Sequence, residues 1–154
     1  MIEKPNLPDD VLVSSLNTQY DLRVKQVEFL PIGNDSAAWV YKVFTANSHT
    51  YFLKVKRGAI TASSVLVPRH LYAAGLIQVV APVPNTTNDL STQLNDFTLI
   101  LYPYVSDENA MDTGMSLEQW AEYGRVVQHI HATELTDAIT QHVPRETFTL
   151  NPRW

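Results

Sequence analysis

The chain has 154 residues, of which 45% are apolar and 18% charged, and this is enough for one compact core or two small lobes. Its formal net charge of −5 and its scattered basic residues argue against a nucleic-acid partner, because no basic stripe or tail is present to meet phosphates. Cysteine is absent, which excludes disulfides, thiolate metal sites and cysteine nucleophiles.

The chain begins with the pattern of a short amphipathic helix. Pro8 followed by Asp9 and Asp10 is typical of a first helical turn, because proline suits the first helical position and carboxylates favour the positive end of the helix dipole. The apolar residues that follow at helical spacing are Val11, Leu12, Leu16 and Tyr20.

Three strands in hairpin succession are expected next. Residues 26–30, 39–44 and 49–55 are runs rich in β-branched and aromatic side chains. Residues 46–48 supply a turn between the second and third runs.

A helix is expected over residues 61–74, with Ser63 or Ser64 as its N-cap and Gly75 directly after its end. Pro68 lies inside this pattern, where it removes a backbone donor and disfavours a helical residue before it. We therefore expect this helix to begin late, near Pro68, or to be kinked there.

Residues 76–83 are expected to form an extended connector. A short strand at 92–94, a turn at 95–96 and a fully buried strand at 97–104 follow it. The predicted fold is therefore α+β, with a sheet of about five mostly antiparallel strands and one packed helix.

The strongest helical pattern comes last. Ser116 and Gln119 form a capping box, and the helix should run to about Ala132. His129 and His131 lie two positions apart on this helix and point away from each other, so they do not form a metal site.

Lys54 is the most informative residue of the expected sheet. Alternation places Lys54 on one side of its strand with Phe52 and Lys56, and places Leu53 and Val55 on the other side. A half-buried ammonium among apolar neighbours normally binds an anion such as a phosphate. The alternative is a lysine whose stem covers apolar surface while its charged end stays in water. Lys56, nearer the strand end, is expected to face solvent.

The segment Gly33-Asn34-Asp35-Ser36 joins the first two strands and is rich in turn-forming residues. Such a loop can direct backbone N–H groups at an anion, and a plain hairpin uses the same residues. Asp35 would repel a triphosphate unless a cation lies between them.

Four segments carry a resemblance to a known family: GNDSAAWVY at 33–41, YFLKVKRG at 51–58, LILYPY at 99–104 and YGRVVQHIHA at 123–132. In this order they resemble the N-terminal lobe of the kinase-like phosphotransferases. The nearest resemblance is to the aminoglycoside phosphotransferase family, and within it to the spectinomycin phosphotransferase group.

The resemblance implies an ATP-dependent transferase of the antibiotic-resistance type. It implies that the loop at residues 33–37 covers the phosphates of ATP, that Lys54 reaches the α- and β-phosphates, and that main-chain groups around Tyr102 and Tyr104 receive the adenine. The cofactor-binding residues implied in this way are Gly33, Asn34, Asp35, Ser36, Lys54, Tyr102 and Tyr104.

Two departures from the family pattern limit what the resemblance implies. The strand lysine of such sites is held by a glutamate on the following helix, but here Asp35 is the one acidic residue between Glu28 and Asp89. The family's His-x-Asp-x-x-x-x-Asn loop and metal-holding Asp do not occur before Trp154. No catalytic or metal-binding residue is therefore assigned. ATP binding is expected to be weak or lost, and Mg would bind only if the missing lobe were supplied.

The chain is interpreted as a kinase-like N-lobe at residues 1–105, followed by a hinge and the first helix of a missing C-lobe at residues 106–154. It would be a truncated phosphotransferase-like domain that binds nucleotide at most weakly and is not catalytic alone. The alternative is a non-catalytic scaffold or dimerisation module that has lost ATP, and a weaker option is a small-molecule sensor that uses the cleft under the loop.

The expected partners follow from the same interpretation. An apolar seam at Leu117, Trp120, Gly124 and Val127 would be exposed without a C-lobe, so we expect a homo-oligomer or a separate C-lobe to cover it. The N-terminus lacks a basic stretch followed by an apolar one, and no apolar run approaches the roughly 20 residues of a membrane span. We therefore expect a cytoplasmic protein with no membrane partner.

Overall fold

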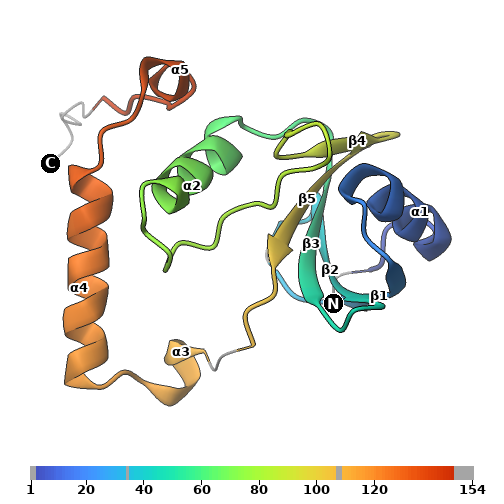
Figure 1. Cartoon of the computed structure of the whole chain (residues 1–154), viewed down its shortest axis with the longest axis horizontal. Coiled ribbons are helices and arrows are strands. Elements are labelled where there is room, and N and C mark those ends of the chain that lie inside the picture. The colour runs from blue at the N-terminus through green and yellow to red at the C-terminus, as the bar shows by residue number, and fades with distance from the viewer. Residues whose placement is uncertain (1–2, 34, 107–108, 148–154) are drawn as a thin grey trace, which may run out of the picture.

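The computed structural model describes residues 3–33, 35–106 and 109–147, and it contains a five-stranded sheet with helices on both sides (Figure 1). The strands lie in the order β1-β2-β3-β5-β4, and every neighbouring pair is antiparallel. Their bounds are β1 Val24–Leu30, β2 Ala38–Thr45, β3 Thr50–Arg57, β4 Thr92–Leu94 and β5 Phe97–Pro103. The predicted α+β fold is confirmed.

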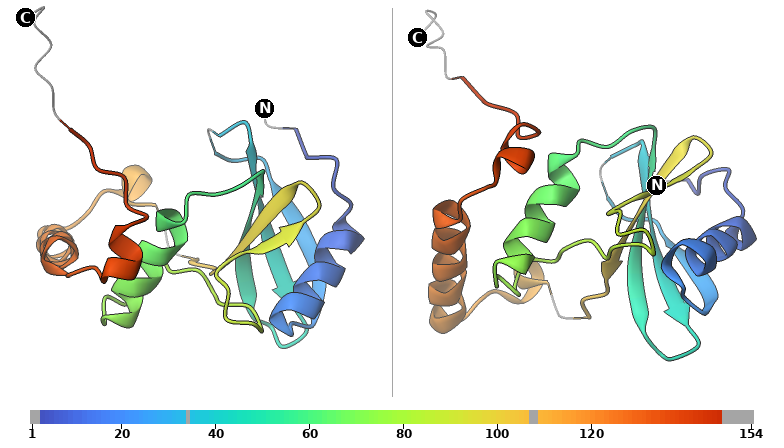
Figure 2. Two further views of the ribbon diagram at one scale, coloured as in Figure 1. Left: turned by 90° about the horizontal axis from the view of Figure 1, so that it is seen from above. Right: turned by 45° about the horizontal axis from the view of Figure 1, so that its top comes forward.

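Helix α1 (Asp9–Tyr20) covers one face of the sheet (Figure 2). Its residues Leu12, Leu16 and Tyr20 recur every four positions and are buried, so one apolar stripe of the helix faces the strands. Alternate residues of three strands complete the core and are fully buried: Tyr41, Val43, Leu53, Val55, Leu99 and Leu101.

Helix α2 (Ser63–Ala73) lies on the opposite side of the sheet from α1 (Figure 2). Gly75 follows its end, as predicted, with a φ of +99°. The N–H of Gly75 donates to the carbonyl of Tyr72 at 3.0 Å, and the N–H of Leu76 donates to the carbonyl of Leu71 at 3.1 Å. These two bonds and the buried pair Leu71 and Leu76 make a Schellman motif.

The expectation that α2 begins late, near Pro68, is wrong. The helix begins at Ser63 and continues through Pro68, and no side chain caps its start. The hydroxyl of Ser64 instead donates to the carbonyl of Thr61 at 2.6 Å. Pro68 removes a single bond, the one that its own N–H would have made to Ser64, and the turns on either side persist.

Three helices follow the sheet: α3 (Ala110–Thr113), α4 (Leu117–Ala132) and α5 (Asp137–Thr140). The capping box of α4 is present, since Ser116 Oγ accepts from the N–H of Gln119 at 3.2 Å and Gln119 Oε1 accepts from the N–H of Ser116 at 2.8 Å. No described residue of these three helices is buried. Leu117 and Trp120 are 88% and 56% exposed.

Among the described residues, no helix has both the length and the apolar character needed to cross a membrane.

Candidate functional site

Strand pairing fixes the position of Lys54 on the sheet. It lies between Val40 of β2 and Ile100 of β5, which are its partners on the neighbouring strands. Leu53 and Val55 are fully buried on the α1 side, so Lys54 points to the opposite face, where it is partly buried. The predicted division of β3 into two faces is confirmed.

On that face Lys54 lines a cavity of about 510 Å³. The lining residues come from β1, β3 and β5 and from three connecting segments: Leu30, Ile32, Phe52, Lys54, Val80, Tyr102, Pro103, Tyr104 and Val105. Lys54 carries the one charged group in this lining. An apolar hollow with a few polar groups at its edge is the usual form of a small-molecule site.

The cavity brings together three of the predicted residues, Lys54, Tyr102 and Tyr104. The rings of Tyr102 and Phe52 meet edge to face with their centroids 6.5 Å apart. A tyrosine hydroxyl is neutral at physiological pH and can donate a hydrogen bond, and burial raises the pKa of Tyr102 further. The N–H of Tyr104 makes only a long bond of 3.4 Å to the carbonyl of Thr50.

Sequence reasoning missed the cation beside Tyr104. The ammonium of Lys42 lies 4.3 Å from the centroid of the Tyr104 ring and 5.3 Å from that of Phe44. Lys42 pairs with Phe52 across β2 and β3, so it lies on the same face as Lys54. The alternation of side chains along β2 would have placed Lys42 on this face.

The exposed apolar rim of the cavity was also missed. Ile32, Val80 and Val105 are 55%, 46% and 52% exposed, and each belongs to a connecting segment. Such segments carry no periodic pattern, so their convergence could not be predicted from the sequence.

Gly33, Asp35 and Ser36 lie in the loop between β1 and β2 and are not among the cavity's lining residues. Asn34, the fourth predicted residue of this loop, falls outside the described residues. Gly33 has a φ of +110°, a conformation that favours glycine.

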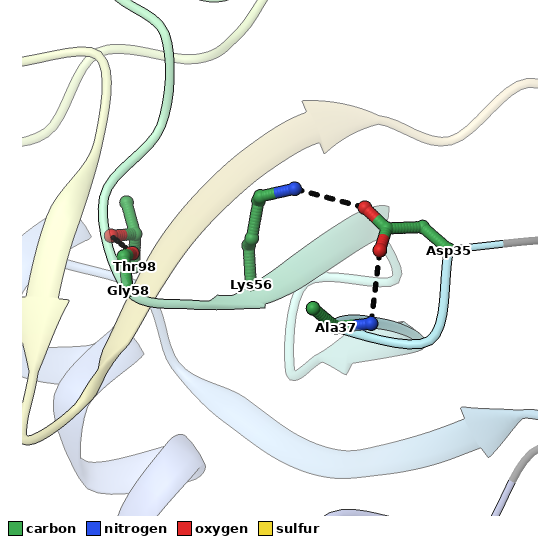
Figure 3. A network of polar contacts seen from close by, with 5 residues as sticks. All are labelled: Asp35, Ala37, Lys56, Gly58 and Thr98. Carbon is green, nitrogen blue, oxygen red and sulfur yellow. Dashed lines mark hydrogen bonds and ion pairs between the residues drawn. The ribbon is translucent and has the colours of Figure 1, made fainter.

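Asp35 forms an ion pair with Lys56 (Figure 3). Lys56 Nζ donates to Asp35 Oδ2 at 2.9 Å, and the N–H of Ala37 donates to Asp35 Oδ1 at 2.9 Å. The hydrogen bond from Lys56, and then that from Ala37, holds the pKa of Asp35 below its ordinary value. Lys56 is partly exposed, as expected near the strand end, with 31% of its side chain accessible, but its ion pair with Asp35 was not predicted.

Lys54 has no carboxylate partner within the described part of the chain. The ion pairs found there join Lys4 to Asp9, Lys56 to Asp35 and Arg125 to Glu122. Helix α2, the next helix after β3, contains no acidic residue. The ammonium of Lys54 is therefore not held in place by an ion pair with α2.

Across residues 3–33, 35–106 and 109–147, no group of three or more His, Asp or Glu side chains is placed to hold a metal ion. Two described histidines have side-chain contacts: His70 Nε2 lies 2.9 Å from the carbonyl oxygen of Glu134, and His49 Nδ1 lies 3.3 Å from Asn47 Nδ2.

The sheet order, the two flanking helices and the strand lysine together define the class of fold: the N-terminal lobe of the aminoglycoside phosphotransferases. The chain matches the N-terminal part of the spectinomycin phosphotransferase APH(9)-Ia, solved in complex with ADP and spectinomycin, with a TM-score of 0.84 and 25% sequence identity. The match covers 92% of this chain and 43% of that chain.

A second similar structure is the amicoumacin kinase hAmiN in complex with AMP-PNP, Ca²⁺ and Ami. It matches with a TM-score of 0.60 and 16% identity over 86% of this chain and 43% of that chain, which shows likeness of fold alone. The chain therefore spans less than half the length of these solved proteins. No protein-family model and no curated protein matches the sequence.

Proposed function

We propose that this chain is the nucleotide-binding half of a kinase of the aminoglycoside phosphotransferase type, with weak affinity for adenine nucleotides and no catalytic activity alone. The observation that carries the proposal is the placement of Lys54, Tyr102 and Tyr104 around one apolar cavity. The apolar walls would take the adenine, and the ammonium would take a phosphate.

The weakness of the proposed binding has a structural reason. Positioning and charge compensation are most of what a kinase lobe contributes, and a lysine without a carboxylate partner must lose side-chain freedom when the nucleotide arrives. Part of the gain from the ammonium–phosphate contact is therefore lost. Mg is proposed to bind only when a lobe that supplies metal ligands is present.

The proposal is tested by calorimetric titration of the chain with ADP and ATP. Lys54→Met is expected to weaken binding by about tenfold or more, because a charge-assisted contact is removed. Lys25→Met is the matched control, since Lys25 is exposed on β1 and does not line the cavity. No binding heat from the unmodified chain at millimolar nucleotide would contradict the proposal.

A second candidate function is a non-catalytic scaffold that has kept the lobe fold and lost ATP. The unpaired state of Lys54 among the described residues favours it, as does the exposure of Met111 and Leu117, which are 90% and 88% exposed. Absence of nucleotide binding together with stable self-association would support this candidate.

We propose that the exposed face of α4 is covered by a second lobe of polypeptide. The solved proteins that the chain matches are more than twice as long as the matched region, and the exposed side chains Leu117, Trp120 and Tyr123 all belong to the last long helix. Light scattering tests this proposal. A chain that stays monomeric supports a second lobe as the partner, whereas a dimer that Trp120→Glu disperses would show that a second copy covers the face instead.

Two further parts of the proposal concern the cellular compartment and the biological role. The cytoplasm is the proposed compartment, because it supplies ATP and suits a chain without cysteine. A role in antibiotic resistance is proposed for the complete kinase, because the chain resembles a spectinomycin phosphotransferase.

A further inference from the structure

Lys56 and Lys54 present two ammonium groups on one face of β3. Residues two apart on a strand point the same way and lie roughly 7 Å apart at their Cα atoms. Lys54 is without a carboxylate partner among the described residues, whereas Lys56 is paired with Asp35 at 2.9 Å. The two lysines therefore differ in whether their charge is already compensated.

The backbone that carries Lys56 is firmly held. The hydroxyl of the fully buried Thr98 donates to the carbonyl of Gly58 at 2.6 Å (Figure 3). The N–H of Gly58 donates to the carbonyl of Asp96 at 2.7 Å. These bonds fasten the end of β3 to the β4–β5 hairpin. Lys56 thus extends from the central strand of the sheet, where β2 and β5 pair with it on either side.

The backbone around Asp35 is held without help from the ion pair. The N–H of Ala38 donates to the Asp35 carbonyl at 3.1 Å, and the N–H of Arg57 donates to the Ala37 carbonyl at 2.9 Å. Asp35 Oδ1 also accepts from the N–H of Ala37. Breaking the contact between Oδ2 and Lys56 would leave all these bonds in place.

The ion pair is placed where another anion can displace it. The side chains of Lys56 and Asp35 are 31% and 47% exposed, and ion pairs as exposed as this are weak. A polyphosphate offers an ammonium several charged oxygens, whereas Asp35 offers one carboxylate. The charge of Lys54 also helps to lower the pKa of Asp35, so Asp35 lies within the field of both lysines.

We propose that Lys56 is a second polyphosphate-binding cation beside Lys54, and that Asp35 occupies it until the ligand arrives. Binding exchanges one partner of Lys56 for another, and the negative charge of Asp35 lowers the affinity of the site. The inference rests on the proposed nucleotide function only in taking the phosphate chain of the nucleotide as the natural ligand. The anion site itself is defined by Lys54, Lys56 and Asp35.

The test uses inorganic tripolyphosphate, which needs no adenine pocket. Its affinity for the full chain is measured by calorimetry at low and high salt. Asp35→Asn keeps the acceptor for the Ala37 N–H and frees Lys56, so binding is expected to become about fivefold tighter. Lys56→Gln is expected to weaken binding about fivefold, and Lys56→Arg to retain it.

Two control variants carry the same charge changes at remote, exposed positions. Asp21→Asn matches Asp35→Asn, and asparagine tolerates the left-handed φ of 50° at this position. Lys25→Gln matches Lys56→Gln. Circular dichroism verifies that each variant is folded. Controls that shift affinity as much as the site variants would show a net-charge effect and overturn the proposal.

Titration of the same variants with ADP separates this inference from the proposed function. If the variants change the affinity for tripolyphosphate as expected and ADP does not bind, the anion site is supported and the nucleotide function is contradicted. If ADP binding depends on Lys54 while Asp35→Asn and Lys56→Gln match their controls, the nucleotide function stands and the inference fails. If tripolyphosphate at millimolar concentration binds neither the unmodified chain nor Asp35→Asn, the inference is also overturned.

Discussion

Tyr41 is fully buried in the core, and its hydroxyl has no hydrogen-bond partner within the described part of the chain. Burial, and then the nearby carboxylate of Asp9, raises the pKa of Tyr41 to about 12. An unfolded tyrosine ionises near pH 10. The stability that depends on neutral Tyr41 is therefore complete below about pH 10 and is lost as the pH rises toward 12, by at most about 3 kcal/mol.

Tyr41→Phe should remove this part of the alkaline sensitivity. Urea unfolding at pH 8 and pH 11 is expected to show a smaller loss of unfolding free energy for the variant, by about 1 kcal/mol. At pH 8 the variant should be at least as stable as the unmodified chain, since an unsatisfied buried hydroxyl is removed. Tyr123→Phe, at a side chain that is 56% exposed, is the control. Equal losses for Tyr41→Phe and the control would show that Tyr41 does not resist ionisation.

At the residue level, the sequence predicted the face to which a side chain points better than the residue that the side chain contacts. Alternation alone assigned Lys54 to the face away from Leu53 and Val55, because a strand has a fixed period of two. It could not assign Lys56 to Asp35, because that contact depends on the conformation of the β1–β2 loop as well as on strand register. Loops carry no such period, so the placement of the loop residues relative to Lys54 was beyond the sequence.

At the level of elements, Pro68 and Gly75 show when a local rule holds. Gly75 fulfils its prediction because a positive φ is needed at the helix end whatever surrounds it. Pro68 does not end α2, because the burial of Val65 and Leu71 on either side of it, about 1.5–3 kcal/mol each, offsets the cost of the proline, about 3 kcal/mol. Tertiary packing therefore outweighs the tendency of proline to end a helix, whereas the preference for glycine directly after a helix end holds.

Replacing glycine with alanine is expected to destabilise the protein at Gly75 and to stabilise it at Gly124. A Cβ at either position would meet no atom within 4 Å, so steric clash is excluded in both cases. Gly75→Ala forces alanine to a φ of +99° and is expected to cost about 1 kcal/mol of unfolding free energy. Gly124 lies inside α4, where alanine should stabilise the helix by about 0.5–1 kcal/mol.

The two effects need two measurements. Gly75→Ala is followed by urea unfolding of the whole chain, because α2 has residues buried in the fold. Gly124→Ala is followed by amide hydrogen exchange within α4, which has no buried residue and can open locally. A stabilising Gly75→Ala, or faster exchange in Gly124→Ala, would contradict the backbone argument.

At the level of the whole molecule, the described residues of the C-terminal helices contribute no buried residue to the core around the sheet. Every buried residue among those described lies between Pro5 and Leu101. Besides a contact between α2 and α5, two side-chain hydrogen bonds join the region of α2 to the segment beyond the sheet: Gln78 to Glu122 at 3.4 Å and His70 to the Glu134 carbonyl at 2.9 Å. Both are exposed, so they contribute little to the stability of the sheet.

A chain that ends at residue 105 should therefore fold alone. Its thermal midpoint is expected within about 5 °C of that of the full chain, because the lost contacts amount to roughly 1 kcal/mol or less. A chain that lacks residues 1–20 is the contrasting case, since it loses Leu12 and Leu16, both fully buried, and should not fold. Calorimetry and circular dichroism distinguish the two. If the first truncation is unfolded, or melts far below the full chain, α4 belongs to the cooperative unit and the predicted boundary between residues 105 and 106 is wrong.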